Sequence, residues 1–188
     1  MYKVFFFVLL TLALSSESDA EKLFTEKHLG FEFKYDDKIS INFDPHAMRK
    51  IPIYYNSFYA GGLVVSVLPE GVTEKLYMDY GLNRYKSDYG KKSVTLSRKA
   101  NESGFEYYHF VVKTKSKGKN ITIEKAIFIK TRKSIIKKEG IKVTYTINYG
   151  YSEDKQMKAL GKIVNSFKLI PNEAHYNDAL LLSIKKQL

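Results

Sequence analysis

The chain contains no cysteine among its 188 residues. This absence excludes disulfide bonds, thiolate metal sites, thiol catalysis and a lipid-modified N-terminal cysteine. The four histidines are never three to five residues apart, so no pair has the spacing of a metal site. A Gly-x-Ser-x-Gly elbow and a glycine-rich phosphate loop are also missing. We therefore expect no metal, no other cofactor and no recognisable catalytic residue, with His109 in a strand as a packing residue or an exposed ring.

Only one long apolar run occurs, and it lies at the N-terminus. Val4–Leu14 carries no charge, follows Lys3, and precedes the small residues Ser18 and Ala20. A charged start, a short apolar core and a small-x-small exit are the parts of a secretory signal peptide. The run is too short for a transmembrane helix, which needs ~20 residues. We expect residues 1–20 to be removed, the mature protein to be secreted or periplasmic, and no transmembrane helix to follow.

Positive charge dominates the composition. The chain has 31 Lys and Arg residues against 20 Asp and Glu residues, and removing Lys3, Glu17 and Asp19 with the leader raises the formal net charge from +11 to +12. Charge of this size favours an acidic protein or an anionic envelope surface as partner. The plain alternative is that the lysines only keep the protein soluble. Export makes nucleic acid an unexpected partner.

The mature chain predicts one α+β domain, residues 21–171, followed by a C-terminal helical tail, residues 172–188. Alternation of apolar and polar residues predicts strands at 31–35, 39–43, 63–68, 93–99, 105–115, 120–132 and 141–151. The first two strands are expected to form a hairpin, and residues 46–60 an aromatic-rich connection. Helical periodicity predicts one helix capped by Thr73 with the face Met78, Leu82, Tyr85 and Tyr89, and another capped by Ser152 with the face Met157, Leu160, Ile163, Val164 and Phe167.

Two segments leave alternatives open. Alternation is blurred around Glu124-Lys125, which indicates either a β-bulge or a central strand with two buried faces. The tail pairs an apolar helix face with two lysines. That face either docks on the sheet as core, lies on a membrane surface, or binds a partner groove.

Two short motifs resemble those of the PsbP-like family. Gly30-Phe31-Glu32-Phe33-Lys34-Tyr35 is similar to its opening motif, and Ile163-Val164-Asn165-Ser166-Phe167-Lys168 to its closing motif. The resemblance covers roughly residues 29–170 and implies an α/β/α sandwich, with one antiparallel sheet flanked by helices. It also implies a binding or assembly-support role, because known members are not generally enzymes. The chain departs from the family pattern at Asp36, where proline is usual, and in having no tryptophan.

An aromatic segment is the first candidate site. Aromatic rings near a cation can stack on a partner, and loops carry function more often than strands do. The predicted partner-binding residues are Arg49, Tyr54, Tyr55, Phe58 and Tyr59. The alternative is that Ile53, Tyr55 and Phe58 only pack against the core.

Lysines clustered at two turns of the strand meander are the second candidate site. The predicted basic surface comprises Lys115, Lys117 and Lys119 at one turn and Lys133, Lys137 and Lys138 at the next. Adjacent clusters along one sheet edge would form a cationic rim for anionic surfaces. The alternative is a solvated charged edge that prevents edge-to-edge pairing.

Together these features predict an exported, non-enzymatic module that binds an acidic partner or supports an envelope assembly. Two alternatives remain open from the sequence. One is an extracytoplasmic hydrolase whose active-site residues are dispersed, and the other is a peripheral protein held on anionic lipid by its basic rim and tail. A convergent set of buried polar groups in a pocket would favour the hydrolase.

The first prediction concerns the leader. We expect cleavage after Ala20, because small residues at 18 and 20 follow the charge-free run. Edman sequencing of protein recovered from the exported fraction should begin at Glu21. A sequence that begins at Met1 would contradict the prediction.

Overall fold

The computed structural model describes residues 20–43 and 50–185; the predicted leader up to residue 19, and Arg49, lie outside the described residues. The described part has an α+β fold with two antiparallel sheets. A seven-stranded sheet has the order β3-β4-β5-β9-β8-β7-β6, and a three-stranded sheet has the order β1-β2-β10. The strands are β1 Lys22–Glu26, β2 Phe31–Tyr35, β3 Ile39–Ile41, β4 Lys50–Tyr55, β5 Phe58–Val67, β6 Val94–Ala100, β7 Glu106–Ser116, β8 Lys119–Arg132, β9 Ile141–Tyr151 and β10 Lys168–Leu169. The helices are α1 Glu74–Tyr89, α2 Asp154–Ser166 and α3 Ala174–Lys185, with a 3-10 turn at Lys91–Ser93.

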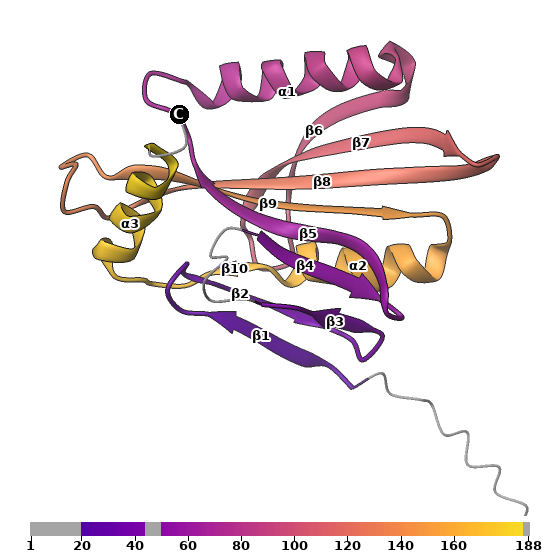
Figure 1. Cartoon of the computed structure of the whole chain (residues 1–188), viewed down its shortest axis with the longest axis horizontal. Coiled ribbons are helices and arrows are strands. Elements are labelled where there is room, and N and C mark those ends of the chain that lie inside the picture. The colour runs from indigo at the N-terminus through magenta and orange to yellow at the C-terminus, as the bar shows by residue number, and fades with distance from the viewer. Residues whose placement is uncertain (1–19, 44–49, 186–188) are drawn as a thin grey trace, which may run out of the picture.

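The large sheet is covered on both faces (Figure 1). On one face α1 packs Met78 against Phe110 of β7 and Ile127 of β8. The other face holds the main core and is covered by α2, α3 and the small sheet. The predicted α/β/α sandwich is therefore confirmed, and the small sheet is an addition that the sequence patterns do not predict.

The central strands follow the predicted alternation. Ile141, Tyr145 and Ile147 of β9 are buried in the main core, as expected for a strand with one face inward. β8 lies between β7 and β9 and keeps an unbroken register with both. The blurred pattern around Glu124 therefore marks a two-sided central strand, and the bulge interpretation is wrong.

The predicted hairpin between residues 31–35 and 39–43 is wrong. β2 pairs with β1, whereas β3 pairs with β4 of the large sheet. The turn between them is present, since the Ile39 N–H donates to the Asp36 carbonyl at 3.1 Å. Two strands with the same alternation fit either pairing, so the pattern alone does not fix the sheet to which each belongs.

Residues 50–60 form a hairpin rather than an irregular connection. β4 and β5 are joined by Asn56 and Ser57, whose φ values of 47° and 67° are left-handed. Left-handed backbone at both central residues is the geometry of the tight turn that suits twisted antiparallel strands. Gly and Asn are the usual residues at these two positions. Because Ser57 is neither, the sequence lacks the usual pattern of a tight hairpin turn.

Of the two predicted helix caps, the one at Thr73 is confirmed and the one at Ser152 is wrong. Thr73 caps α1, because its Oγ1 accepts the Leu76 N–H at 3.2 Å. Ser152 does not cap α2, which begins at Asp154. The Ser152 N–H instead donates to Oε1 of Gln156 at 3.1 Å, so a side chain inside the helix reaches back to this end.

The tail helix docks on the sheet as core. Leu180 and Leu181 of α3 are buried in the main cluster. Asn177 donates from Nδ2 to the Lys133 carbonyl at 2.9 Å. The core interpretation of the tail is therefore confirmed for this part of α3, while residues 186–188 lie outside the described residues.

Arg132, the last residue of β8, joins the two sheets. Its Nε donates to the Tyr145 hydroxyl at 2.9 Å, Nη1 to the Ile170 carbonyl at 2.9 Å and Nη2 to the Gly30 carbonyl at 2.5 Å. The Tyr145 hydroxyl in turn donates to the Leu29 carbonyl at 2.9 Å. Gly30 has a left-handed φ of 75°, and a Cβ there would lie 2.9 Å from the Ile170 oxygen, so the close approach requires glycine.

We expect Arg132→Met to lower the free energy of unfolding by about 3 kcal/mol, because it leaves several buried acceptors without a donor. Arg132→Lys should restore little of this loss, since one ammonium group cannot reach all three acceptors. Urea unfolding measures both values. The matched control is Arg98→Met, which removes an exposed pair with Glu106 and should cost less than about 1 kcal/mol. Equal losses at the two positions would contradict the role of Arg132.

Candidate functional sites

A buried polar cluster lies on the inner face of the large sheet, under α2. Its centre is Glu124 of β8, which receives three hydrogen bonds. His109 Nε2 lies 2.7 Å from Oε2, the Tyr149 hydroxyl 3.1 Å from Oε2, and the Tyr151 hydroxyl 2.6 Å from Oε1. These residues come from three adjacent strands, β7, β8 and β9.

The cluster keeps Glu124 ionised. Burial alone would raise the pKa of its carboxyl, but the hydrogen bonds from His109 and Tyr151 outweigh that and lower the pKa to about 2. An ionised carboxylate only accepts hydrogen bonds, so His109 Nε2 must carry a hydrogen. Burial, followed by the negative charge of Glu124, raises the pKa of Tyr149, and burial with the same carboxylate raises the pKa of Tyr151 to about 12.

A cavity lies beside this cluster, with His109, Glu124 and Tyr149 among its lining residues. It has a volume of about 360 Å³, and the described residues that line it include no serine, threonine or cysteine. His109 directs Nε2 to Glu124, and its Nδ1 is buried without a hydrogen-bond partner among the described residues. A general base must reach the proton that it removes. In this structure His109 Nε2 is engaged by Glu124, and both side chains line the cavity.

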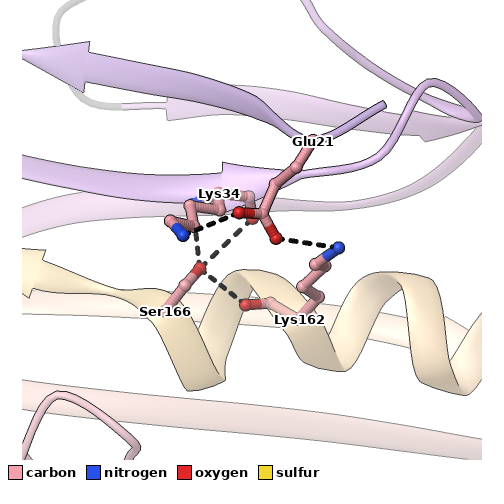
Figure 2. Close-up of polar contacts among 4 residues, drawn as sticks. All are labelled: Glu21, Lys34, Lys162 and Ser166. Atoms are coloured by element: carbon pink, nitrogen blue, oxygen red, sulfur yellow. Dashed lines mark hydrogen bonds and ion pairs between the residues drawn. The ribbon is translucent and has the colours of Figure 1, made fainter. Parts of the chain in front are cut away.

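A second polar cluster joins Glu21, which precedes β1, to β2 and α2 (Figure 2). The Glu21 carboxylate lies 2.6 Å from Nζ of Lys34 and 3.0 Å from Nζ of Lys162. The hydrogen bonds from these two lysines lower the pKa of Glu21. Ser166 accepts the Lys34 N–H at 2.8 Å and donates to the Lys162 carbonyl at 2.7 Å. The charged groups are exposed, so the cluster positions the chain and contributes little to stability.

Residues 20–43 and 50–185 bring together no group of three or more His, Asp or Glu side chains that could hold a metal ion. Within the same ranges, no helix has the length and apolar character needed to cross a bilayer.

The structure divides the predicted aromatic site. Tyr55 is half-buried and packs against the main core, while Tyr54 lies edge-on to Tyr59 with ring centroids 5.9 Å apart. Phe58 and Tyr59, just after the β4–β5 turn, are 80% and 57% exposed. The packing alternative therefore fits Tyr55 and not Phe58. Arg49 cannot be placed beside them because it lies outside the described residues.

The two lysine clusters lie at opposite ends of β8. Lys115, Lys117 and Lys119 surround the β7–β8 turn, and Lys133, Lys137 and Lys138 lie in the β8–β9 loop. β8 has 14 residues, which at ~3.3 Å per residue separates the clusters by about 40 Å. They form two patches rather than one rim. Lys137 is partly engaged, since its Nζ lies 2.8 Å from Oε1 of Glu70.

Strand pairing places the first lysine cluster at the same end of the sheet as the exposed aromatics. The register Gly61↔Tyr149 and Thr122↔Tyr151 puts the β4–β5 turn and the β7–β8 turn at the same end of the sheet, as Figure 1 shows. Two strand spacings, about 10 Å, separate β5 from β8. We call this surface, composed of Phe58, Tyr59, Lys115, Lys117 and Lys119, the hairpin end.

Sequence reasoning missed the pairing of His109 with Glu124. In the structure His109 lies opposite Ala126, two residues from Glu124, so the two side chains are diagonal neighbours on one sheet face. A histidine and a carboxylate at inward positions of consecutive strands were the available signal. Recognising it requires the register, which the sequence patterns do not fix.

The fold is similar to two solved structures. One is cyanobacterial PsbP (CyanoP) from Synechocystis sp. PCC 6803, with 13% identity, a TM-score of 0.51, and coverage of 82% of this chain and 95% of that chain. The other is LpqN, involved in cell envelope biogenesis of Mycobacterium tuberculosis, with 10% identity, a TM-score of 0.52, and coverage of 84% and 88%. No protein-family model matches the chain, and no curated protein matches its sequence. The likeness concerns the fold, and it confirms that this fold is PsbP-like.

The Glu124 cluster predicts a pH dependence of stability. The folded pKa of about 2 lies below the ordinary 4.5, so the stabilisation is present above about pH 4.5 and is lost as the pH falls toward 2. Between about pH 6 and about pH 3, the wild type should lose on the order of 1–2 kcal/mol more than Glu124→Gln in urea unfolding. Glu106→Gln, which changes an exposed carboxylate, should keep the wild-type profile. A Glu124→Gln profile equal to the wild type would contradict the assignment.

Proposed function

We propose that the protein is an exported, non-enzymatic module that supports an envelope assembly by binding an acidic partner through the hairpin end. The charged and apolar leader supports export. The shared fold with LpqN, a protein of cell envelope biogenesis, supports an envelope role. The excess of 31 basic over 20 acidic residues supports an acidic partner.

The observation that carries this proposal is the exposure of Phe58 and Tyr59 at the same end of the sheet as the β7–β8 lysines. Large aromatic side chains bury much area at low entropic cost, and they are enriched at the centres of protein interfaces. The tight turn at Asn56 and Ser57 fixes them at the end of two paired strands. Little conformational entropy is therefore lost when a partner covers these rings.

The lysines complement this aromatic contact, because they attract an acidic partner and disfavour a basic one. Lys115, Lys117 and Lys119 are exposed, and an exposed charge acts over a Debye length of ~8 Å at physiological salt. Complementary charges at an interface mainly raise the association rate and exclude partners of the wrong sign. The hairpin end therefore suits a protein that presents an apolar patch bordered by Asp and Glu.

The test uses exported protein and poly-glutamate as a defined acidic probe, followed by recovery of native partners from the envelope. Lys115→Gln/Lys117→Gln/Lys119→Gln should weaken poly-glutamate binding by about tenfold at low salt, and the difference should shrink as salt rises. Phe58→Ser/Tyr59→Ser should reduce recovery of an acidic envelope protein, identified by mass spectrometry, while leaving poly-glutamate binding nearly unchanged.

The matched control is Lys133→Gln/Lys138→Gln at the other end of β8, which should retain the acidic protein. Recovery of the same proteins with the wild type and with the aromatic variant would overturn the role of the hairpin end. Thermal unfolding of each variant, which should match the wild type, confirms that the substitutions act on binding.

A further inference from the structure

The loop between β8 and β9 exposes two adjacent isoleucines. Ile135 is 76% exposed and Ile136 is 56% exposed. The β8–β9 loop that carries them lies at the end of the sheet opposite the hairpin end, beside α3 (Figure 1). Single exposed apolar residues are common on protein surfaces, but adjacent ones bordered by charge mark a contact surface.

The loop is held in place by its own hydrogen bonds. Asp178 of α3 accepts the Ser134 hydroxyl at 2.5 Å and the Ile135 N–H at 2.8 Å. The Ser134 hydroxyl oxygen also accepts the N–H groups of Ile136 at 3.1 Å and Lys137 at 2.9 Å. These bonds fix the backbone around the isoleucines, so the two apolar side chains are presented to solvent by an ordered loop.

A third apolar side chain extends this surface. Leu182 is 49% exposed and lies four residues after Asp178, so the two share one face of α3. Asp178 holds the loop, which places Leu182 on the helix face that meets it. Lys133 and Lys138, both exposed, flank the isoleucines in the sequence.

We propose that this surface, composed of Ile135, Ile136, Leu182, Lys133 and Lys138, contacts an anionic lipid bilayer. The isoleucines would enter the boundary between headgroups and acyl chains, and the lysine ammonium groups would meet lipid phosphates. Exposed aliphatic side chains with cations beside them match a bilayer whose acyl region is apolar and whose headgroups are anionic. This role is separate from the hairpin end and does not depend on its partner.

The lysines at the hairpin end provide an internal comparison. Lys115, Lys117 and Lys119 carry as much charge as the β8–β9 cluster, but the exposed apolar residues at that end are aromatic and lie on another hairpin. If charge alone attracted the protein to lipid, both ends would bind anionic vesicles equally. The proposal predicts that the β8–β9 loop dominates.

The experiment measures co-sedimentation of exported protein with vesicles of phosphatidylglycerol and phosphatidylcholine, and with phosphatidylcholine alone. Wild type should bind the anionic vesicles at low salt. Ile135→Ser/Ile136→Ser should lower the partition coefficient by ~tenfold or more, and Lys133→Gln/Lys138→Gln by about fivefold per lysine. Phe58→Ser/Tyr59→Ser is the matched control and should bind like wild type. Absence of wild-type binding, or equal binding by the isoleucine variant, would overturn the proposal.

Insertion can be read out directly because the chain has no tryptophan. Ile136→Trp should show a blue-shifted emission and quenching by brominated lipid when anionic vesicles are added. Tyr59→Trp at the hairpin end should show neither. A shift at residue 59 alone, or a loss of protein partners instead of vesicles in Ile135→Ser/Ile136→Ser, would assign the loop to something other than a bilayer. The second result would leave the proposed function of the hairpin end intact, whereas a shift at residue 59 would also contradict that function.

Discussion

The buried guanidinium of Arg132 is the interaction on which the arrangement of both sheets depends. It ends the central strand β8 and donates to the carbonyls of Gly30 and Ile170, which flank the small sheet. Immediately beyond it, Asn177 binds the Lys133 carbonyl and Asp178 binds the start of the β8–β9 loop. One buried residue thus sets the small sheet, and the residues that follow it fix α3 and the loop. The core around it is aromatic. The ring of Phe167 stacks on those of Phe128 and Phe31, with ring centroids 4.5 Å and 5.6 Å apart.

This rigid centre separates two surfaces of different chemistry along β8. At the hairpin end, aromatic rings and lysines lie on two tight turns, which suits an acidic protein surface. At the loop end, aliphatic side chains and lysines lie on a loop fixed by Asp178, which suits a lipid surface. The two proposals together would make the sheet a spacer of about 40 Å between a protein partner and a bilayer.

Period and turn chemistry predicted the elements whose partners are their neighbours in sequence. The β9 strand, the cap at Thr73 and the buried stripe of α2 from Leu160 to Phe167 needed only local pattern. Pairing of β2 with β1, the Arg132 contacts and the Glu124 cluster depend on register across long separations, which local patterns leave open. The exposure of Ile135 and Ile136 was equally hidden, because an apolar pair in a sequence normally signals core, and only the structure shows that these side chains face solvent.

The central claim is that the two ends of β8 meet different environments. It is tested most directly by placing a photo-crosslinking amino acid at Tyr59 or at Ile136 and irradiating intact cells that produce the protein. We expect residue 59 to capture an acidic protein and residue 136 to capture lipid, with no exchange of products between the positions. Capture of the same protein at both positions, or of lipid at residue 59 and protein at residue 136, would contradict the account.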